Sequence, residues 1–196
     1  MNTKLKKLED LPVLVLVAPG FEEVELTAPV DILRRLGVKV VLAGVQGLSV
    51  KGAHDLTLQA DMLLVDVAPE NFRGVILPGG QASWTLRETA AVRALVQDMF
   101  KADKLVAAIC AAPLALEAAG VLSGRRITCY PADGVRGDIT SVRSISEDSV
   151  VVDGNIINGR GPGAAMDFGF ALGEYLGCGE QVPQLKVDMC YCAAAS

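Results

Sequence analysis

Short, mainly apolar runs recur along the chain, and segments with helical character separate them. The runs are four to six residues long and occupy 13–18, 38–43, 74–77 and 105–110. Such a run between turn residues is typical of a strand buried on both faces of a parallel sheet. Parallel strands need a crossover connection, and helices of ten to fifteen residues supply it. The pattern therefore predicts an α/β sandwich with a mostly parallel central sheet and helices on both faces.

The composition favours one globular domain over residues 1–196, with 1–11 as a polar lead-in. The 196 residues are enough to bury a full core, and 51% hydrophobic against 21% charged residues excludes a disordered chain. The apolar runs are far too short to span a bilayer, and the lead-in lacks the apolar segment of a secretory signal. A net charge of −5 without basic clusters argues against nucleic acid as a partner. We expect a cytoplasmic protein that binds neither membranes nor nucleic acids.

Two segments are predicted as amphipathic helices. The first covers 21–36 and ends at Gly37, and Pro29 inside it predicts a kink or a break into two pieces. Its predicted inward stripe consists of Val24, Ala28, Ile32 and Leu36. The second covers 89–102, with predicted inward residues Val92, Leu95, Val96 and Met99.

The remaining segments predict further strands and helices in alternation. An Asp-Gly-Asn turn favours a hairpin between 150–152 and 156–157. The other expected elements are a short strand at 55–58, a strand at 126–129, a helix at 164–176 and an amphipathic segment at 180–191.

Residues 105–116 place Cys110 on a strand-to-helix turn, because an apolar run stops at Cys110 and an Ala- and Leu-rich segment follows. Pro113 stands where the first helical turn tolerates proline. This geometry lifts a nucleophile above the carboxyl edge of a sheet and favours a thiolate at the positive end of a helix. The alternative is a small buried hydrophobe, the commonest role of a free cysteine. This stretch alone leaves both interpretations open.

The cysteine and histidine content points away from disulfides and metal. The odd number of cysteines and the lack of a CxxC motif indicate free thiols in a reducing compartment. With one histidine in the chain, no Cys/His zinc site, and no other metal or cofactor, is expected. Cys190 and Cys192 are either soft-metal ligands or an oxidisable pair, or, as we prefer, a helix-borne pair in the core. The five cysteines are Cys110, Cys129, Cys178, Cys190 and Cys192.

Three predicted strand ends carry unusual residues, and ligands of parallel sheets bind at such ends. These ends are Pro19-Gly20 with the glutamates that follow, Gly79-Gly80, and Cys110. Together with their neighbours they resemble the DJ-1/PfpI (ThiJ/PfpI) superfamily, specifically its parkinsonism-associated DJ-1 branch. The matching segments keep the family's order: 17–25 (VAPGFEEVE), 29–40 (PVDILRRLGVKV), 77–80 (LPGG), 107–113 (AAICAAP) and 159–168 (GRGPGAAMDF). The resemblance implies a flavodoxin-like sandwich with the cysteine on a nucleophile elbow.

The resemblance also implies a set of site residues. Cys110 matches the reactive cysteine and Glu25 the acid that hydrogen-bonds its sulfur. Gly80 and Ala111, with Gly79 beside them, match the backbone N–H groups of an oxyanion pocket. A protonated carboxyl beside a thiolate donates a hydrogen bond that stabilises the anion. The residues alone leave simpler interpretations open: Glu25 as an exposed acid in a first helical turn, and the glycines as a tight turn.

Two positions depart from the family's pattern. Tyr130 stands where the deglycase branch often has histidine, and with a pKa near 10 a tyrosine is a poor base at neutral pH. Ala111 stands where the family's proteases have histidine, so peptidase activity is disfavoured. The only histidine, His54, lies in the variable region 44–61 and is expected at the surface. The role of base would then fall on Glu25.

The resemblance extends to the pocket wall and to a dimer. Tyr130 and Arg160 are expected to line the pocket, Tyr130 as a hydrogen-bond donor or an aromatic wall. Arg34 and Arg35 match positions near the interface and pocket, although surface charge is the default for both. A homodimer is expected through the C-terminal helix and the helix at 24–36.

Two functions share this site. In the first, Cys110 adds to the aldehyde of a 2-oxoaldehyde such as methylglyoxal, Glu25 moves a proton, and hydrolysis yields a 2-hydroxy acid without a cofactor. This is a glyoxalase III or deglycase type of reaction, acting on small aldehydes or on glycated proteins. In the second, the protein is a redox sensor or chaperone of the oxidative stress response, and Cys110 is oxidised to a sulfinate.

Overall fold

The fold is built on one seven-stranded, mostly parallel sheet. A computed structural model describes residues 8–191, and the order of the strands in the sheet is β10-β11-β7-β6-β1-β2-β5. All neighbours pair in parallel except β10 and β11, which form the antiparallel hairpin predicted around Asp153–Ile156. The strands are β1 (Val13–Val17), β2 (Val40–Gly44), β5 (Met62–Leu63), β6 (Gly74–Leu77), β7 (Leu105–Ile109), β10 (Val150–Asp153) and β11 (Ile156–Gly159).

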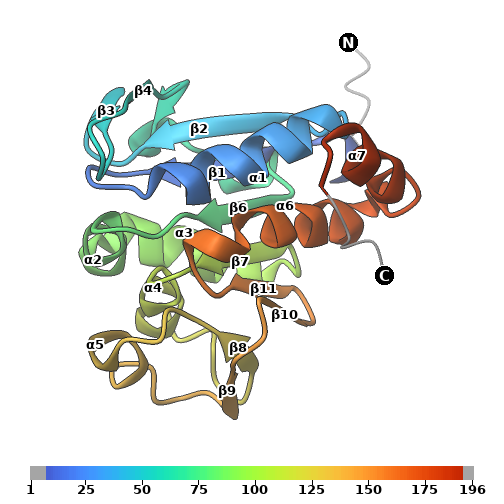
Figure 1. Ribbon diagram of the computed structural model, residues 1–196. Coiled ribbons are helices and arrows are strands. Elements are labelled where there is room, and N and C mark those ends of the chain that lie inside the picture. Colours follow the sequence, from blue (N-terminus) through green and yellow to red (C-terminus); the bar gives the residue numbers. More distant parts are fainter. Residues whose placement is uncertain (1–7, 192–196) are drawn as a thin grey trace.

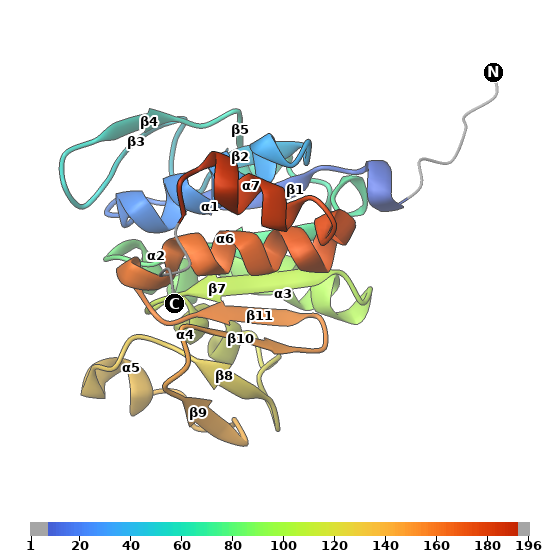
Figure 2. The same ribbon diagram turned by 45° about the vertical axis from the view of Figure 1, so that its right-hand side comes forward.

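Helices cover both faces of the sheet (Figures 1 and 2). One face is covered by α1 (Glu23–Arg35), α6 (Ala165–Gly173) and α7 (Val182–Asp188), with the π-helical turn Glu174–Cys178 joining the last two. The other face is covered by α2 (Ala82–Glu88), α3 (Ala90–Lys101) and α4 (Pro113–Ala118). The predicted parallel α/β sandwich is therefore confirmed. None of the helices in residues 8–191 has the length and apolar character needed to span a bilayer.

Two small additions flank the main sheet. The hairpin of β3 (Ser49–Lys51) and β4 (Thr57–Gln59) lies at one end of the molecule, and the pair β8 (Arg126–Thr128) and β9 (Ser144–Ser146) lies at the other with α5 (Asp133–Arg136) (Figure 1). Three-residue 3-10 turns occupy Leu8–Asp10, Leu64–Asp66, Pro69–Asn71 and Pro162–Ala164.

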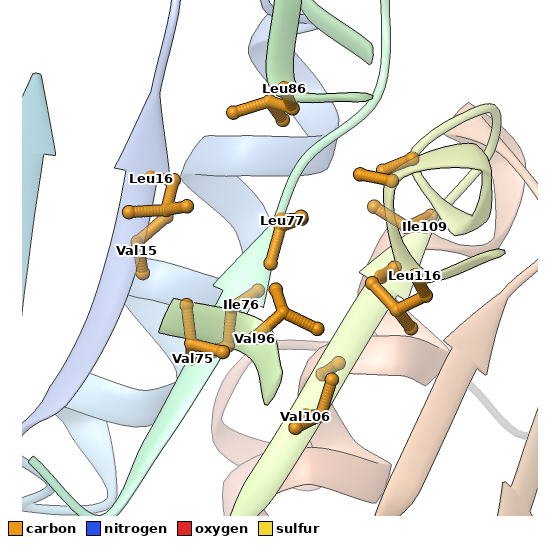
Figure 3. Close-up of a cluster of buried hydrophobic side chains, with 14 of the residues drawn as sticks. Val15, Leu16, Val75, Ile76, Leu77, Leu86, Val96, Val106, Ile109 and Leu116 are labelled. Carbon is orange, nitrogen blue, oxygen red and sulfur yellow. The ribbon is translucent and has the colours of Figure 1, made fainter. Parts of the chain in front are cut away.

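The core lies between the central strands and the helices of each face. Every residue of β1 and β7 is buried, as expected for strands covered on both faces. Figure 3 shows the part of this core between β1, β6, β7 and the helices α2, α3 and α4. Its members include Val15, Leu16, Val75, Ile76, Leu77, Leu86, Val96, Val106, Ile109 and Leu116.

The inward stripe predicted for the first helix is confirmed at Ile32, which is fully buried, and in part at Ala28 and Leu36, which pack against the core, but it is wrong at Val24. Val24 is 41% exposed, whereas Glu25 and Leu26 beside it are buried. The helix is turned so that a carboxyl group faces the sheet edge, and this choice cannot be read from apolar spacing. The predicted break at Pro29 is also absent, because α1 continues through it. Proline removes the hydrogen bond that its N–H would donate to the carbonyl four residues earlier, and its ring crowds that carbonyl, but α1 tolerates both changes without ending.

Other sequence expectations are refined or corrected. All four residues predicted to face inward from 89–102 are buried. The helix α2 was not predicted, because the interpretation of 81–88 stopped at the glycine turn. The strand at 126–129 forms, but it pairs with β9 outside the main sheet. Cys190 is exposed and follows the end of α7, so it is no helix-borne core residue, and Cys192 lies outside the described residues.

Candidate active site

Cys110 occupies the turn between β7 and α4 in a strained backbone conformation. Its φ is 66°, a region that residues with a side chain seldom occupy and that clusters at functional sites. Two backbone hydrogen bonds fix it: Cys110 donates to Gly159 O at 2.9 Å, and its own carbonyl accepts from Tyr130 N at 2.9 Å. The predicted strand-to-helix turn is therefore present, and neighbouring strands hold it in place.

Glu25 lies in the first turn of α1, next to the glycines that follow β6, with no exposed surface. One carboxyl oxygen accepts a hydrogen bond from Gly79 N at 3.0 Å, whereas Oε1 is buried and has no hydrogen-bond partner among the described residues. Burial raises the pKa of Glu25 to about 7, against the opposing effects of the Cys110 thiol and the Gly79 N–H. The simpler interpretation of Glu25 as an exposed acid in a first helical turn is therefore excluded.

Cys110 and Glu25 form a coupled acid pair. Burial raises the pKa of the Cys110 thiol, an ionised Glu25 raises it further, and backbone N–H groups of Gly80 and Ala111 lower it. This direction is opposite to the lowered pKa expected from the helix terminus, because α4 has only six residues and the sulfur is buried. A protonated Glu25 reverses the sign of its own effect, since its O–H then donates to the sulfur. These directions leave the single proton of the pair on the sulfur, so the thiolate form requires transfer of that proton to Glu25.

Two glycines allow the strand ends to approach this pair. Gly80 has a φ of 78°, and a Cβ there would lie 2.5 Å from Gly20 O and 2.6 Å from Glu22 N. The bridge between Phe21 and Gly80 depends on this close approach. Gly79 was predicted as part of the oxyanion pocket, but its N–H is taken by Glu25. The N–H groups that lower the pKa of the Cys110 thiol are those of Gly80 and Ala111.

A cavity of about 500 Å³ opens above Cys110. Two half-exposed aromatic side chains, Trp84 and Tyr130, form part of its wall. Gln81 and Ala111 also line it. The volume lies in the range of small-molecule sites, and apolar walls with a few polar groups are typical of them. Trp84 and Gln81 were missed in the sequence because α2 was not recognised.

Arg160 lies beside this cavity and not in it. Arg160 lines a smaller hollow of about 260 Å³, which shares Tyr130 and Pro162 with the cavity above Cys110. Its guanidinium is paired with Glu147, both with the carboxylate and, at 2.9 Å, with the backbone carbonyl. Tyr130 lies where the pocket was expected, whereas Arg160 is engaged elsewhere.

His54 lines the cavity that contains Cys110, although its side chain is 70% exposed, as a surface histidine was expected to be. Its Nδ1 lies 2.9 Å from Glu23 Oε2, and its backbone N–H donates to Glu23 Oε1 at 2.6 Å. The hydrogen bond with Glu23 and the charges of Glu22 and Glu23 raise the pKa of His54. No local pattern in the sequence signals this placement, because the two partners lie 31 positions apart in the chain.

Within residues 8–191, the donor atoms of Glu22, Glu23 and His54 come within 4.8 Å of one another, so this group has the composition to bind a cation. Partial burial works to raise the pKa of Glu23, but the hydrogen bonds from the His54 ring and backbone outweigh it and lower that pKa. When His54 is protonated, the cluster therefore contains an ion pair of His54 with Glu23 and a second carboxyl group, that of Glu22.

The fold and the site define an α/β sandwich protein with a buried acid and a cysteine on a strand-to-helix elbow. The model of the DJ-1/PfpI family matches residues 12–174. This chain belongs to the DJ-1/PfpI family, as its motifs predict.

Individual relatives cover nearly the whole chain. The protein dj-1beta of Drosophila melanogaster is 39% identical over 175 residues, which are 88% of this chain and 92% of that protein. Its crystal structure has a TM-score of 0.86 over 92% of this chain and 97% of that chain, at 37% identity. A protein from Pyrococcus abyssi named a deglycase is 38% identical over 77% of this chain and 90% of its own length. The structure titled Toxoplasma gondii DJ-1, oxidized, has a TM-score of 0.82 at 32% identity, covering 92% and 98% of the two chains.

Proposed function

We propose that this protein converts 2-oxoaldehydes such as methylglyoxal, or their early adducts on proteins, into 2-hydroxy acids without a cofactor. The observation that carries the proposal is the buried pair of Cys110 and Glu25. Burial raises the pKa of Glu25 to about 7, which suits a group that gains and loses a proton at neutral pH. Relatives named deglycases support the same class of chemistry.

The first step forms a covalent bond at the elbow. The Cys110 thiolate attacks the aldehyde carbon, the carbonyl oxygen takes up the proton held by Glu25, and a hemithioacetal results. While negative charge develops on this oxygen, the N–H groups of Gly80 and Ala111 are the available backbone donors.

The second step moves a hydrogen between adjacent carbons. Glu25, now ionised, removes the proton from the former aldehyde carbon, and the neighbouring ketone oxygen takes up a proton from solvent, so that an enediol forms. Glu25 then returns its proton to the neighbouring carbon while the hydroxyl group of the former aldehyde carbon releases its proton to solvent, which gives a thioester of the 2-hydroxy acid on Cys110. Water then cleaves the C–S bond, which releases the acid and restores the sulfur. Tyr130 is 44% exposed, whereas Glu25 is fully buried, so Glu25 is the proposed acid and base.

Conversion of methylglyoxal to lactate by the purified protein, without glutathione, tests this proposal. We expect turnover by the wild type, and loss to background in Cys110→Ala and Glu25→Gln. Cys190→Ala is the matched control because Cys190 is an exposed thiol outside the cavity. Equal rates for the wild type and Cys110→Ala would contradict the proposal.

A second function, redox sensing, is favoured by the same hydrogen-bond donors around Cys110. Two equivalents of peroxide oxidise a thiolate to a sulfinate and leave two of water. Gly80, Ala111 and a protonated Glu25 offer hydrogen-bond donors to the two sulfinate oxygens. Mass spectrometry after mild peroxide treatment tests it: we expect a gain of two oxygens that is absent from Cys110→Ala. Oxidation spread over all the cysteines would contradict it.

A further inference from the structure

A second cavity, of about 420 Å³, opens at the amino ends of β6 and β7. Arg73 and Lys104, the residues that directly precede these two strands, both line it. Leu105 N donates to Arg73 O at 3.2 Å, and the parallel register pairs Gly74 with Leu105. The backbones of Arg73 and Lys104 are therefore neighbours, about 5 Å apart. Cys110 follows the opposite end of β7, about 16 Å from Leu105, so this cavity is separate from the site of the proposed function.

The positive charges of Arg73 and Lys104 are only partly compensated by the protein. Arg73 donates from Nη1 to Leu176 O at 3.4 Å, and its Nε is buried with no hydrogen-bond partner among the described residues. Lys104 donates from Nζ to Pro69 O at 2.9 Å. Within residues 8–191 neither side chain forms an ion pair. Like charges on adjacent strands repel, so a negative charge between the two would stabilise this edge of the sheet.

Two acidic residues also line the cavity, but they do not supply that charge. The charge of Glu9 acts to raise the pKa of Arg73, and burial outweighs it, so that the pKa of Arg73 is lowered. Burial and the charge of Asp103 raise the pKa of Tyr175, whose side chain is 40% exposed. The phenol of Tyr175 therefore stays protonated at neutral pH and adds an O–H donor to the cavity wall.

We propose that this cavity binds a small molecule with an oxyanion group, a carboxylate or a phosphate, between Arg73 and Lys104. A guanidinium has several N–H donors in a planar fork that matches two oxygens of such a group, and the ammonium beside it adds a further charged contact. The volume lies in the range of small-molecule sites, which leaves room for the uncharged part of the ligand against Tyr175. The site goes beyond the proposed function, because none of its residues touches the Cys110 cavity.

NMR titration of the 15N-labelled protein with inorganic phosphate and, separately, with lactate tests this proposal. We expect saturable shifts of the backbone amides of Leu105 and Gly177, which line the cavity. Saturation by phosphate alone assigns a phosphate group to the ligand, and saturation by lactate alone assigns a carboxylate. Arg73→Gln and Lys104→Gln are each expected to weaken the binding about 10-fold, because each removes a charge-assisted hydrogen bond.

Two controls separate a specific site from a general attraction of anions. Lys101→Gln removes the same charge from the exposed end of α3, outside the cavity, and is expected to keep the wild-type affinity, as is Cys110→Ala. Equal weakening by Lys101→Gln, shifts that rise linearly with either probe, or unchanged affinity in Lys104→Gln would refute the site. If Arg73→Gln does not fold, as judged by circular dichroism, Lys104→Gln decides the question by itself.

Discussion

Replacing Glu25 by glutamine is predicted to stabilise the protein at alkaline pH while it abolishes activity. Each pKa unit between the folded and unfolded states corresponds to about 1.4 kcal/mol. A pKa moved from 4.5 to about 7 therefore corresponds to about 3 kcal/mol of unfolding free energy. Glutamine has the same shape, keeps an oxygen for the N–H of Gly79 and cannot ionise, so it removes this cost.

The sign of the effect follows from which state binds the proton more tightly. The folded state binds the proton of Glu25 more tightly. Below pH 4.5 the carboxyl is protonated in both states, so no free energy is spent on ionising a buried group. As the pH rises through 7, the folded protein must ionise a buried group, and stability is lost. We expect Glu25→Gln to differ from the wild type by less than about 1 kcal/mol at pH 5 and to exceed it by about 3 kcal/mol at pH 8. At pH 8 this corresponds to a Tm higher by roughly 10 °C.

Urea denaturation at pH 5, 6, 7 and 8 measures this difference directly. Glu88→Gln, at the exposed end of α2, is the matched control and is expected to show no such pH dependence. The same comparison in a Cys110→Ala background removes the coupled thiol and is expected to keep the trend. A stability difference that stays constant from pH 5 to pH 8 would refute the assignment of a raised pKa to Glu25.

Two further predictions concern glycines. In Gly79→Ala, the new Cβ would overlap Glu25 Oε2 and lie 2.6 Å from Cys110 Cβ. We therefore expect loss of methylglyoxal turnover and of about 1–3 kcal/mol of stability. A wild-type kcat would show that Cys110 and Glu25 do not need this close approach of the backbone. In Gly169→Ala, the Cβ would lie 2.7 Å from Ile32 Cδ1 and 3.0 Å from Pro29 Cα, which separates α6 from α1 and costs about 1–3 kcal/mol in urea denaturation. Gly179→Ala, which points into open space at negative φ, is the control expected to be neutral, and an equal loss there would contradict the packing argument.

Local patterns in the sequence determined the architecture and the elbow. The apolar runs that form β1, β6 and β7 are buried on both faces. A strand of this kind can be predicted from its apolar composition alone. The turn at Cys110 was predictable because it lies between a β-type run and a helix-forming segment that are contiguous in the chain. The five ordered motifs added the family and the partnership of Cys110 with Glu25.

Tertiary structure decided the features that depend on residues far apart in the chain. The rotation of α1 about its axis places Glu25 inward and leaves Val24 exposed. This rotation is set by all the contacts of the helix with the sheet edge and with α6, and not by the spacing of its apolar residues alone. The engagement of Gly79 with Glu25 spans 54 residues, and the attachment of His54 to Glu23 spans 31. The spacing of apolar residues in the sequence indicates which face of a single segment is apolar. The contacts of Glu25 and His54 depend instead on how several segments pack together. The sequence and its motifs therefore predicted that Cys110 and Glu25 lie together, and only the tertiary structure placed His54 on the same cavity.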